Sequence, residues 1–192
     1  MRGRRGPEAE AEALGLDEIV ALLVGAADVP LGPGSVSQLD HAVQTASLLA
    51  NSHPDRPELA AAGLVHDIGH PLPGVTDETH AAAGAHAIRT ALGRHVAAVV
   101  ALHVEAKQYL VTTEPGYAGA LAPDSTASLV HQGGTLSHAA VRAFRSKPLA
   151  GAALALRRAD DRAKVAGARV EPLEHWVDVL RGLSSRSGRT RA

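Results

Sequence analysis

Apolar residues recur along this chain at the three- and four-residue spacing of one helix face, and no segment alternates as a half-buried strand does. Gly and Pro clusters interrupt the pattern, for example over residues 29–34 and 69–74. Residues 111–134 are only weakly periodic and are predicted to form a long loop, a kind of segment that often carries function. The periodic segments predict an all-α fold, a helical bundle, with helices over residues 8–27, 37–51, 58–68, 79–92, 94–109, 137–145, 148–166 and 172–183.

The length of 192 residues suits one domain, and the helical segments place that domain at residues 8–183. A cap at Ser35 or Ser37 is expected to begin the second helix, which ends near Asn51. Residues 1–7 are basic and residues 184–192 are polar and basic, so both ends are predicted to be disordered. No apolar run is long enough to span a bilayer or to follow the first arginines as a secretory signal. We therefore expect a cytoplasmic protein without a membrane partner.

Composition narrows the classes of function. The net charge is −1, and the aromatic residues are one Trp, two Tyr and one Phe. Because nucleic-acid-binding proteins present basic faces and aromatic rings for stacking, we do not expect a nucleic-acid partner. Cys is absent, which excludes disulfides and thiolate metal sites, whereas the eleven His favour a metal such as iron, manganese or zinc.

The stretch His66-Asp67-Ile68-Gly69-His70 lies at the C-terminal end of the helix predicted over 58–68. Neighbouring His and Asp side chains can ligate one metal ion, and the second carboxylate oxygen can bridge to another. Taken alone, the pair could equally be a capping Asp beside a surface His.

Further His and Asp residues occupy positions where an unpaired polar group would be costly. One His lies near an apolar helix face and another in the middle of a helix, and one Asp follows an apolar run in a helix that is predicted to be buried. Each alone could be satisfied by ordinary hydrogen bonds. Together they form a set over five predicted helices: His41, His66, Asp67, His80, His103 and Asp160.

The order His, His-Asp, His, His, Asp resembles the HD-domain superfamily, most members of which are metal-dependent phosphohydrolases. Within it, the sequence is similar to the PhnZ-type mixed-valent di-iron oxygenases that cleave phosphonates, and distantly to myo-inositol oxygenase. The resemblance covers about residues 37–164. Its motifs are QLDHAVQ at 38–44, LVHDIGH at 64–70, GAHA at 84–87, HVEAKQYL at 103–110, QGG at 132–134 and LRRADDRAK at 156–164.

The resemblance implies two iron ions, Fe(II) and Fe(III), with O2 as co-substrate. It implies that one iron is held by His41, His66, Asp67 and Asp160, and the other by His80, His103 and a bridging Asp67. Asp161 competes with Asp160 for the ligand role, although the two point about 100° apart on a helix. We favour Asp160, because the family ligand lies four residues before a Lys, as Asp160 does before Lys164.

A substrate site is also implied, and helical spacing agrees with it. Lys107 lies four residues after His103, Arg157 three before Asp160, and His70 four after His66, so each shares a helix face with a predicted ligand. Arg offers a planar fork of donors to a tetrahedral oxyanion, and Lys a point charge. Without the resemblance, solvated helix surface would describe Lys107 and Arg157 equally well. The implied phosphonate-binding residues are His70, Lys107, Ser125, Ser128 and Arg157.

Two positions depart from the pattern. PhnZ-type enzymes carry a Tyr ten residues and a Glu seven residues before the first His ligand, where this chain has Leu31 and Gly34. A Glu would suit a substrate ammonium group, so its loss argues against an aminated substrate.

The resemblance implies an O2-dependent di-iron oxygenase that cleaves the C–P bond of a small 1-hydroxyphosphonate and releases phosphate and a carboxylic acid. The partner is then a small organophosphonate, and no catalytic residue beyond the metal centre is implied. One alternative is a phosphohydrolase that uses the same ligands to activate water against a phosphate ester. Others are oxygenation of a polyol, or a regulatory domain that binds without turnover. The sequence does not determine the oligomeric state.

Overall fold

The computed structural model describes residues 12–32 and 36–189. The prediction of an all-α fold is confirmed: the described residues form helices and no β-strand, with one isolated bridge between Pro30 and Ser37. The helices are α1 (Leu16–Gly25), α2 (Gln38–Ser52), α3 (Pro57–Leu64), α4 (His80–Thr113), α5 (Tyr117–Ala120), α6 (Pro123–His131), α7 (His138–Arg145), α8 (Ala150–Arg162) and α9 (Leu173–Arg189).

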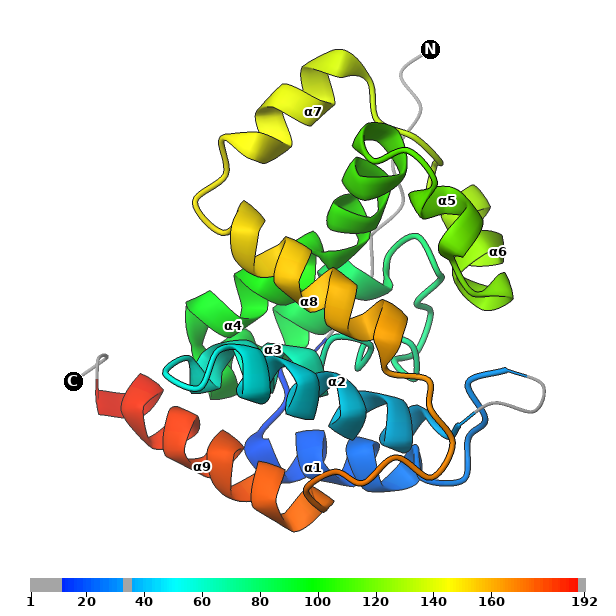
Figure 1. The fold of residues 1–192 in the computed structure, drawn as a ribbon. Helices are drawn as coiled ribbons and strands as arrows, with labels where there is room; N and C mark the ends of the chain where they lie inside the picture. Colours follow the sequence, from blue (N-terminus) through cyan, green and yellow to red (C-terminus); the bar gives the residue numbers. More distant parts are fainter. Residues whose placement is uncertain (1–11, 33–35, 190–192) are drawn as a thin grey trace.

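The main core forms where α2, α3, α4 and α8 pack together, with α1 and α9 completing it on one side. Figure 1 shows α5 and α6 standing at one edge of this bundle and α7 at its upper end. A smaller apolar cluster joins α7 to α4 and α8 through Phe144, which is fully buried. Across the described residues, no helix combines the length and the apolar character needed to cross a bilayer.

Helix α4 bends sharply at Gly93, where φ is 87° and ψ is 165°. This residue joins the two helices that the sequence predicts over 79–92 and 94–109. A residue with a Cβ rarely adopts this left-handed φ, so Gly is required at the kink. The bend lets His80 at the start of α4 and His103 beyond the kink turn toward one another.

Helix α3 ends at Leu64, so the predicted helical end at residue 68 is wrong. Val65 leaves the helical conformation, and residues 65–72 continue as a series of turns. The His66 Nδ1 is 2.8 Å from the carbonyl oxygen of Gly63, which would accept from the Asp67 N–H if the helix continued. The stretch from His66 to His70 therefore lies in a turn whose side chains are not constrained to one helix face.

Other boundaries differ for local reasons. Residues 8–11 of the first predicted helix lie outside the described residues, and 12–15 are not helical; Gly15 is the N-cap of α1 and its N–H donates to Glu18. Ser37 caps α2 through the Asp40 N–H, whereas Ser35 is not described. Helix α8 is shorter than predicted because Ala163 leaves the helix and its carbonyl oxygen contacts the His41 ring.

Two expectations of irregular structure are corrected. Residues 111–134 contain the end of α4 and the helices α5 and α6, with Pro123 in the first turn of α6 and Gly116 in the left-handed conformation before α5. Residues 184–189, expected in a disordered tail, continue α9, where the Ser185 and Arg186 side chains donate to the Gly182 carbonyl oxygen. The segment 1–7, also expected to be disordered, is not described.

Gly69 allows the backbone of the turn after α3 to lie close to the backbone of α4. A Cβ at residue 69 would lie 2.0 Å from the carbonyl oxygen of His80 and 3.0 Å from the amide nitrogen of Gly84. We predict that Gly69→Ala lowers the free energy of unfolding by about 1–3 kcal/mol or more, because backbone must move. In the matched control Gly151→Ala, the added Cβ has no atom within 4 Å. This variant should raise the free energy of unfolding by up to about 1 kcal/mol. Urea unfolding measures both, and a Gly69→Ala protein as stable as wild type would contradict this packing.

Candidate metal centre

Four buried histidines point their Nε2 atoms at one another. They are His41 from α2, His66 from the turn after α3, and His80 and His103 from the two halves of α4. The Nε2 atoms form two pairs, 3.3 Å apart for His41 and His66 and 3.0 Å apart for His80 and His103. The kink in α4 and the turn after α3 thus bring together side chains that are far apart in sequence.

Each of these rings is held from behind by a backbone carbonyl oxygen. The Nδ1 atoms lie 2.7–2.8 Å from the carbonyl oxygens of Ala163, Gly63, Asp77 and Val100. Because a carbonyl oxygen only accepts, Nδ1 must carry the proton in every case. The Nε2 lone pairs therefore face the centre, which is the tautomer that a metal ligand requires.

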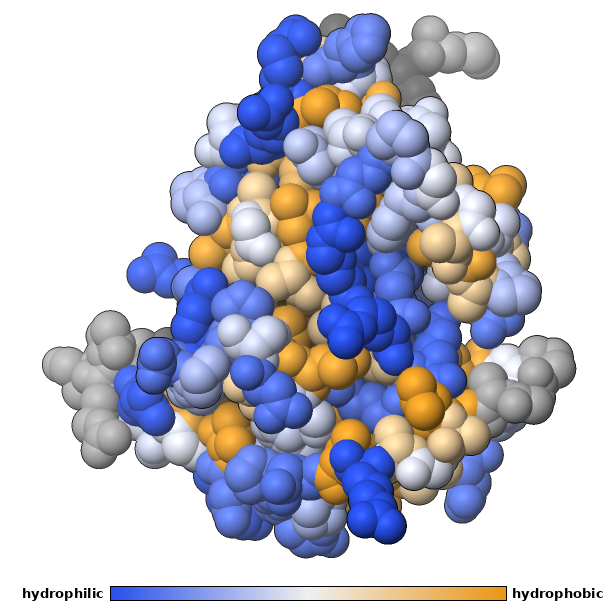
Figure 2. Space-filling model, viewed as in Figure 1, coloured by the Kyte–Doolittle hydropathy of each residue, from blue (hydrophilic) through white to orange (hydrophobic). Residues whose placement is uncertain are grey.

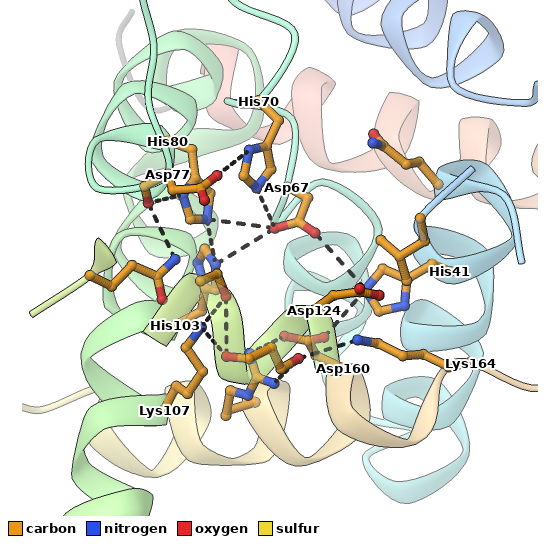
Figure 3. Close-up of a pocket in the computed structure, with 16 residues that line it drawn as sticks. His41, Asp67, His70, Asp77, His80, His103, Lys107, Asp124, Asp160 and Lys164 are labelled. Carbon is orange, nitrogen blue, oxygen red and sulfur yellow. Dashed lines mark hydrogen bonds and ion pairs between the residues drawn. The ribbon is translucent and has the colours of Figure 1, made fainter. Parts of the chain in front are cut away.

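Asp67 lies between His41 on one side and His80 and His103 on the other, as Figure 3 shows. Its Oδ2 is 3.3 Å from the His66 Nε2 and 4.0 Å from the His41 Nε2. Its Oδ1 is 3.7 Å from the Nε2 atoms of both His80 and His103. One carboxylate thus faces both pairs, with a different oxygen toward each.

Asp160, rather than Asp161, faces the first pair. Its Oδ1 is 3.3 Å from the His41 Nε2 and its Oδ2 is 3.8 Å from the His66 Nε2. Asp161 points away and pairs with Arg157 and with the Tyr117 hydroxyl. The roughly 100° between neighbouring positions on α8 separates the two carboxylates.

Protonation states at most residues of this cluster favour metal binding. His41 is the exception, because burial alone would lower its pKa but the hydrogen bond and charge of Asp160 raise it above its ordinary value. Burial lowers the pKa of His103 to about 3, because desolvation disfavours the imidazolium. Burial alone would raise the pKa of Asp67, but the neighbouring imidazoles, His66 first, hold it well below its ordinary value. For Asp160 the Arg157 guanidinium likewise outweighs burial and lowers the pKa. Both carboxylates are therefore anionic at neutral pH.

The donor set fits two transition-metal ions. His41, His66 and Asp160 place ligand atoms within 4.8 Å of one another, and Asp67, His70 and His80 form a second such group. His103 lies beside this second group, with its Nε2 3.0 Å from the His80 Nε2 and 3.7 Å from the Asp67 Oδ1. Imidazole nitrogens and carboxylate oxygens suit borderline ions such as iron or zinc, and two His with one carboxylate is the ligand set of many non-haem iron oxygenases. An Asp that offers one oxygen to each group can bridge the two ions.

A polar cavity of about 300 Å³ opens beside this centre. Figure 2 shows hydrophilic surface in the hollow between α8 and the α5–α6 segment. Its wall contains the two carboxylates and three of the histidines of the centre, together with cationic and hydroxyl side chains. The implied substrate residues are all among its lining: His70, Lys107, Ser125, Ser128 and Arg157.

The cations of the cavity converge on the first turns of α6. The Lys107 Nζ donates to the Ser128 Oγ at 2.8 Å and to the Ser125 carbonyl oxygen at 3.5 Å. The Ser125 Oγ receives hydrogen bonds from the Lys164 Nζ at 3.2 Å and from Arg157 at 3.3 Å. Burial and the nearby Arg157 lower the pKa of Lys107 to about 8, so its cation is held in an environment that favours an anionic partner.

Arg157 is engaged on most of its donors. It is 3% exposed; its Nη1 lies 2.7 Å from the Asp160 Oδ2, and its Nη2 donates to Asp161 and Ser125. Its Nε donates to the Tyr117 hydroxyl at 3.3 Å. Of its five N–H groups, few remain for an incoming anion. Arg157 therefore orients Asp160 as well as adding charge to the cavity.

His70 lies at the edge of the centre. Its Nε2 is 3.7 Å from the Asp67 Oδ1, and its ring stacks on His80 with centroids 4.0 Å apart. It differs from the other four rings because its Nδ1 faces the Asp77 side chain, at 3.8 Å, and its side chain is 33% exposed. This position is within reach of both a metal at Asp67 and a substrate in the cavity.

Sequence reasoning missed several residues of the site. Lys164 served only as a spacing marker, and nothing in the pattern singled out Tyr117, which falls in the segment expected to be a loop. Leu31 lines the cavity, whereas Gly34, the second departure from the family pattern, lies outside the described residues. The remaining lining residues with polar side chains were not predicted: Gln38, Asp77, Asp124 and Gln132.

Comparison with known proteins identifies three relatives of similar length. A hydroxymethylphosphonate dioxygenase of Gimesia maris is 37% identical over 151 residues, which cover 74% of this chain and 75% of that protein. A glycine-betaine-forming 1-hydroxy-2-(trimethylamino)ethylphosphonate dioxygenase of Leisingera caerulea is 30% identical over 150 residues, or 73% and 74% of the two chains. The uncharacterized protein L432 of Acanthamoeba polyphaga mimivirus is 29% identical over 157 residues, 76% of this chain and 71% of that protein.

The HD domain family matches residues 39–164, a region that contains all six histidines and aspartates of the centre. The match spans more than half of the chain, and the resemblance to PhnZ-type proteins seen in the motifs agrees with the names of two relatives. The chain belongs to the HD-domain family.

Proposed function

We propose that this protein is an O2-dependent di-iron oxygenase that cleaves the C–P bond of a small 1-hydroxyphosphonate. The observation that carries the proposal is the placement of Asp67, which offers one carboxylate oxygen to each of two histidine pairs beside a cationic cavity. The two relatives named as phosphonate dioxygenases support the same reaction class.

Two iron ions, when bound, supply chelation of the substrate oxygens and the electrons that activate O2. The chain contributes the ligands and their orientation. His41, His66 and Asp160 would hold one ion, and His80 and His103 the other, with Asp67 bridging. The carbonyl groups behind the rings keep each Nε2 directed at its ion, so the site needs little rearrangement on loading.

The cavity positions the phosphonate. Lys107 and Lys164 neutralise its charge, and the Ser125 and Ser128 hydroxyls, now bonded to these cations, can turn to donate to its oxygens. Arg157 contributes charge while it holds Asp160 in place. Placing the dianion here puts the neighbouring carbon and its hydroxyl toward the histidines.

The reaction balances without a further reductant. The substrate, R–CH(OH)–PO₃²⁻, and O2 give R–COO⁻, HPO₄²⁻ and H⁺. The C–P bond and one C–H bond break, C1 is oxidised to a carboxylate, and O2 is the oxidant.

The substituent on C1 is small, and positions 31 and 34 carry no acidic side chain that could bind an ammonium group on it. The cavity volume of about 300 Å³ lies at the lower end of the range for ligand pockets. Leu31 presents an apolar side chain at the wall, and Gly34 offers none where PhnZ-type enzymes carry the Glu that suits an ammonium group. Asp77 and Asp124 in the same wall disfavour a second anionic group on the substrate. Hydroxymethylphosphonate, on which the Gimesia maris relative acts by name, meets these conditions.

Phosphate release by iron-loaded protein tests the proposal. We predict release from hydroxymethylphosphonate only when O2 is present, with formate as the second product, and slower release from 2-amino-1-hydroxyethylphosphonate. Phosphomonoesters serve as the comparison. Release from phosphomonoesters in the absence of O2 would contradict the oxygenase and favour hydrolysis on the same scaffold.

Among the cations of the cavity, Lys107 is the one whose removal should weaken phosphonate binding most. It is 2% exposed, and within the described residues its Nζ donates to a hydroxyl and a carbonyl oxygen of α6. We predict that Lys107→Met raises KM for the phosphonate roughly tenfold to a hundredfold, the loss of about 1.5–3 kcal/mol for a hydrogen bond to a charged group.

The matched control is Lys147→Met. Lys147 pairs with Glu105 away from the cavity lining, and its side chain is 37% exposed. Its KM should match wild type, and bound iron should be unchanged in both variants. An unchanged KM in Lys107→Met would remove Lys107 from the substrate site.

A further inference from the structure

A second, apolar cavity adjoins the metal centre from the side of α1. Its volume is about 40 Å³, large enough for a small diatomic molecule but not for a phosphonate with its hydration shell. Its wall is mainly aliphatic: Leu22, Leu23, Ala26, Ala42, Leu64, Ile68 and Pro71. The same wall includes His41, His66 and Asp67, so the cavity ends at the metal ligands themselves.

This apolar cavity continues toward the surface. A wider hollow of about 400 Å³ shares Leu22, Ala26, Gln38 and Pro71 with it. The hollow adds Ala21, Gly25 and Val29 at the C-terminal end of α1, and His70, which also lines the polar cavity. Val29 is 41% exposed, which places the outer end of the hollow at solvent. A route lined mostly by apolar side chains thus leads from the surface at α1 to Asp67.

The polar cavity provides a separate approach to the same ligands. It shares Gln38, His41 and Asp67 with the apolar cavity, but its other lining residues include Lys107, Arg157 and Lys164. A bound phosphonate would fill the polar approach, because that is where the cations lie. The apolar approach has no cation or hydroxyl to attract such an anion.

Apolar cavities take up apolar gases, and in this one the hydrogen-bonding side chains are confined to Gln38 and to His41, His66 and Asp67 at the inner end. We propose that this apolar cavity is the access route and holding site for O2, which reaches the metal centre while the phosphonate occupies the polar cavity. The assignment rests on the proposed oxygenase function and adds to it a separate path for the second substrate. Of the residues that border both the inner cavity and the outer hollow, Leu22 has the largest aliphatic side chain, so we expect its size to control passage between them.

Substitutions at Leu22 should change the O2 dependence in a graded way. Leu22 is half-buried, so the larger side chain of a Phe can be accommodated there with partial repacking. In iron-loaded protein, Leu22→Phe narrows the path and should raise KM for O2 by on the order of tenfold. Leu22→Ala widens it and should leave KM for O2 equal to or below that of wild type. Neither should shift KM for the phosphonate more than about twofold, since the polar cavity is untouched.

The matched control is Leu48→Phe. Leu48 is also half-buried against the core but lines none of the cavities described above. Its KM for O2 should equal that of wild type even if its stability falls. A Leu22→Phe protein whose KM for O2 changes no more than that of Leu48→Phe would overturn the proposal.

Xenon gives a readout that does not need turnover. Methyl NMR of the full-length protein without added metal should show xenon-induced shifts at Leu22, Leu23, Leu64 and Ile68, and Leu22→Phe should abolish them. Wild-type methyls that do not respond to xenon would also overturn the proposal.

Different results would contradict the proposed function and the O2 path. Wild-type protein that consumes no O2 with any phosphonate would defeat the proposed function and, with it, the O2 path. Intact wild-type turnover with a Leu22→Phe KM for O2 like that of the control would defeat the path alone.

Discussion

Backbone carbonyl groups fix the tautomers of four buried histidines, and the metal centre depends on this constraint. Two of these carbonyls belong to Gly63 and Ala163, at the points where α3 and α8 end. The last carbonyls of a helix have no partner within it, and here a ring N–H takes that place. The ends of α3 at Leu64 and of α8 at Arg162 therefore orient the rings of His66 and His41, so that their Nε2 lone pairs face the centre.

Charge organises the cavity beside the centre. Asp160 is anionic and buried, and the anionic Asp67, whose side chain is 31% exposed, lies near it, an arrangement that is costly unless cations compensate it. Arg157 compensates Asp160 directly, and Asp161 with the Tyr117 hydroxyl holds Arg157 from its other side. This network leaves Lys107 and Lys164 as the cations most available to an incoming anion. In the proposed function, Arg157 therefore orients the metal ligand Asp160, while the two lysines bind the substrate.

The sequence predicts the helical bundle and brings out the six residues that the structure gathers, because buried His and Asp stand out in apolar helices. It does not predict the helical ends at Leu64 and Arg162. The first coincides with a local hydrogen bond between His66 and the Gly63 carbonyl, and the second with a long-range one between His41 and the Ala163 carbonyl. Helices α5 and α6 are likewise missed, because short helices bounded by Gly and Pro have weak periodicity. The hydrogen bonds of the Tyr117 hydroxyl to Asp161 and Arg157 join α5 to α8. No spacing pattern along the chain indicates them.

The central claim is that Asp67 joins two metal ions, and iron analysis combined with electron paramagnetic resonance tests it most directly. The account predicts two iron ions per chain in wild type, spin-coupled in the mixed-valent state. In Asp67→Asn the coupling should be lost and the iron content reduced, because a neutral amide offers one oxygen instead of two. The control Asp161→Asn should keep two coupled ions. One iron per wild-type chain, or two uncoupled ions, would contradict the account.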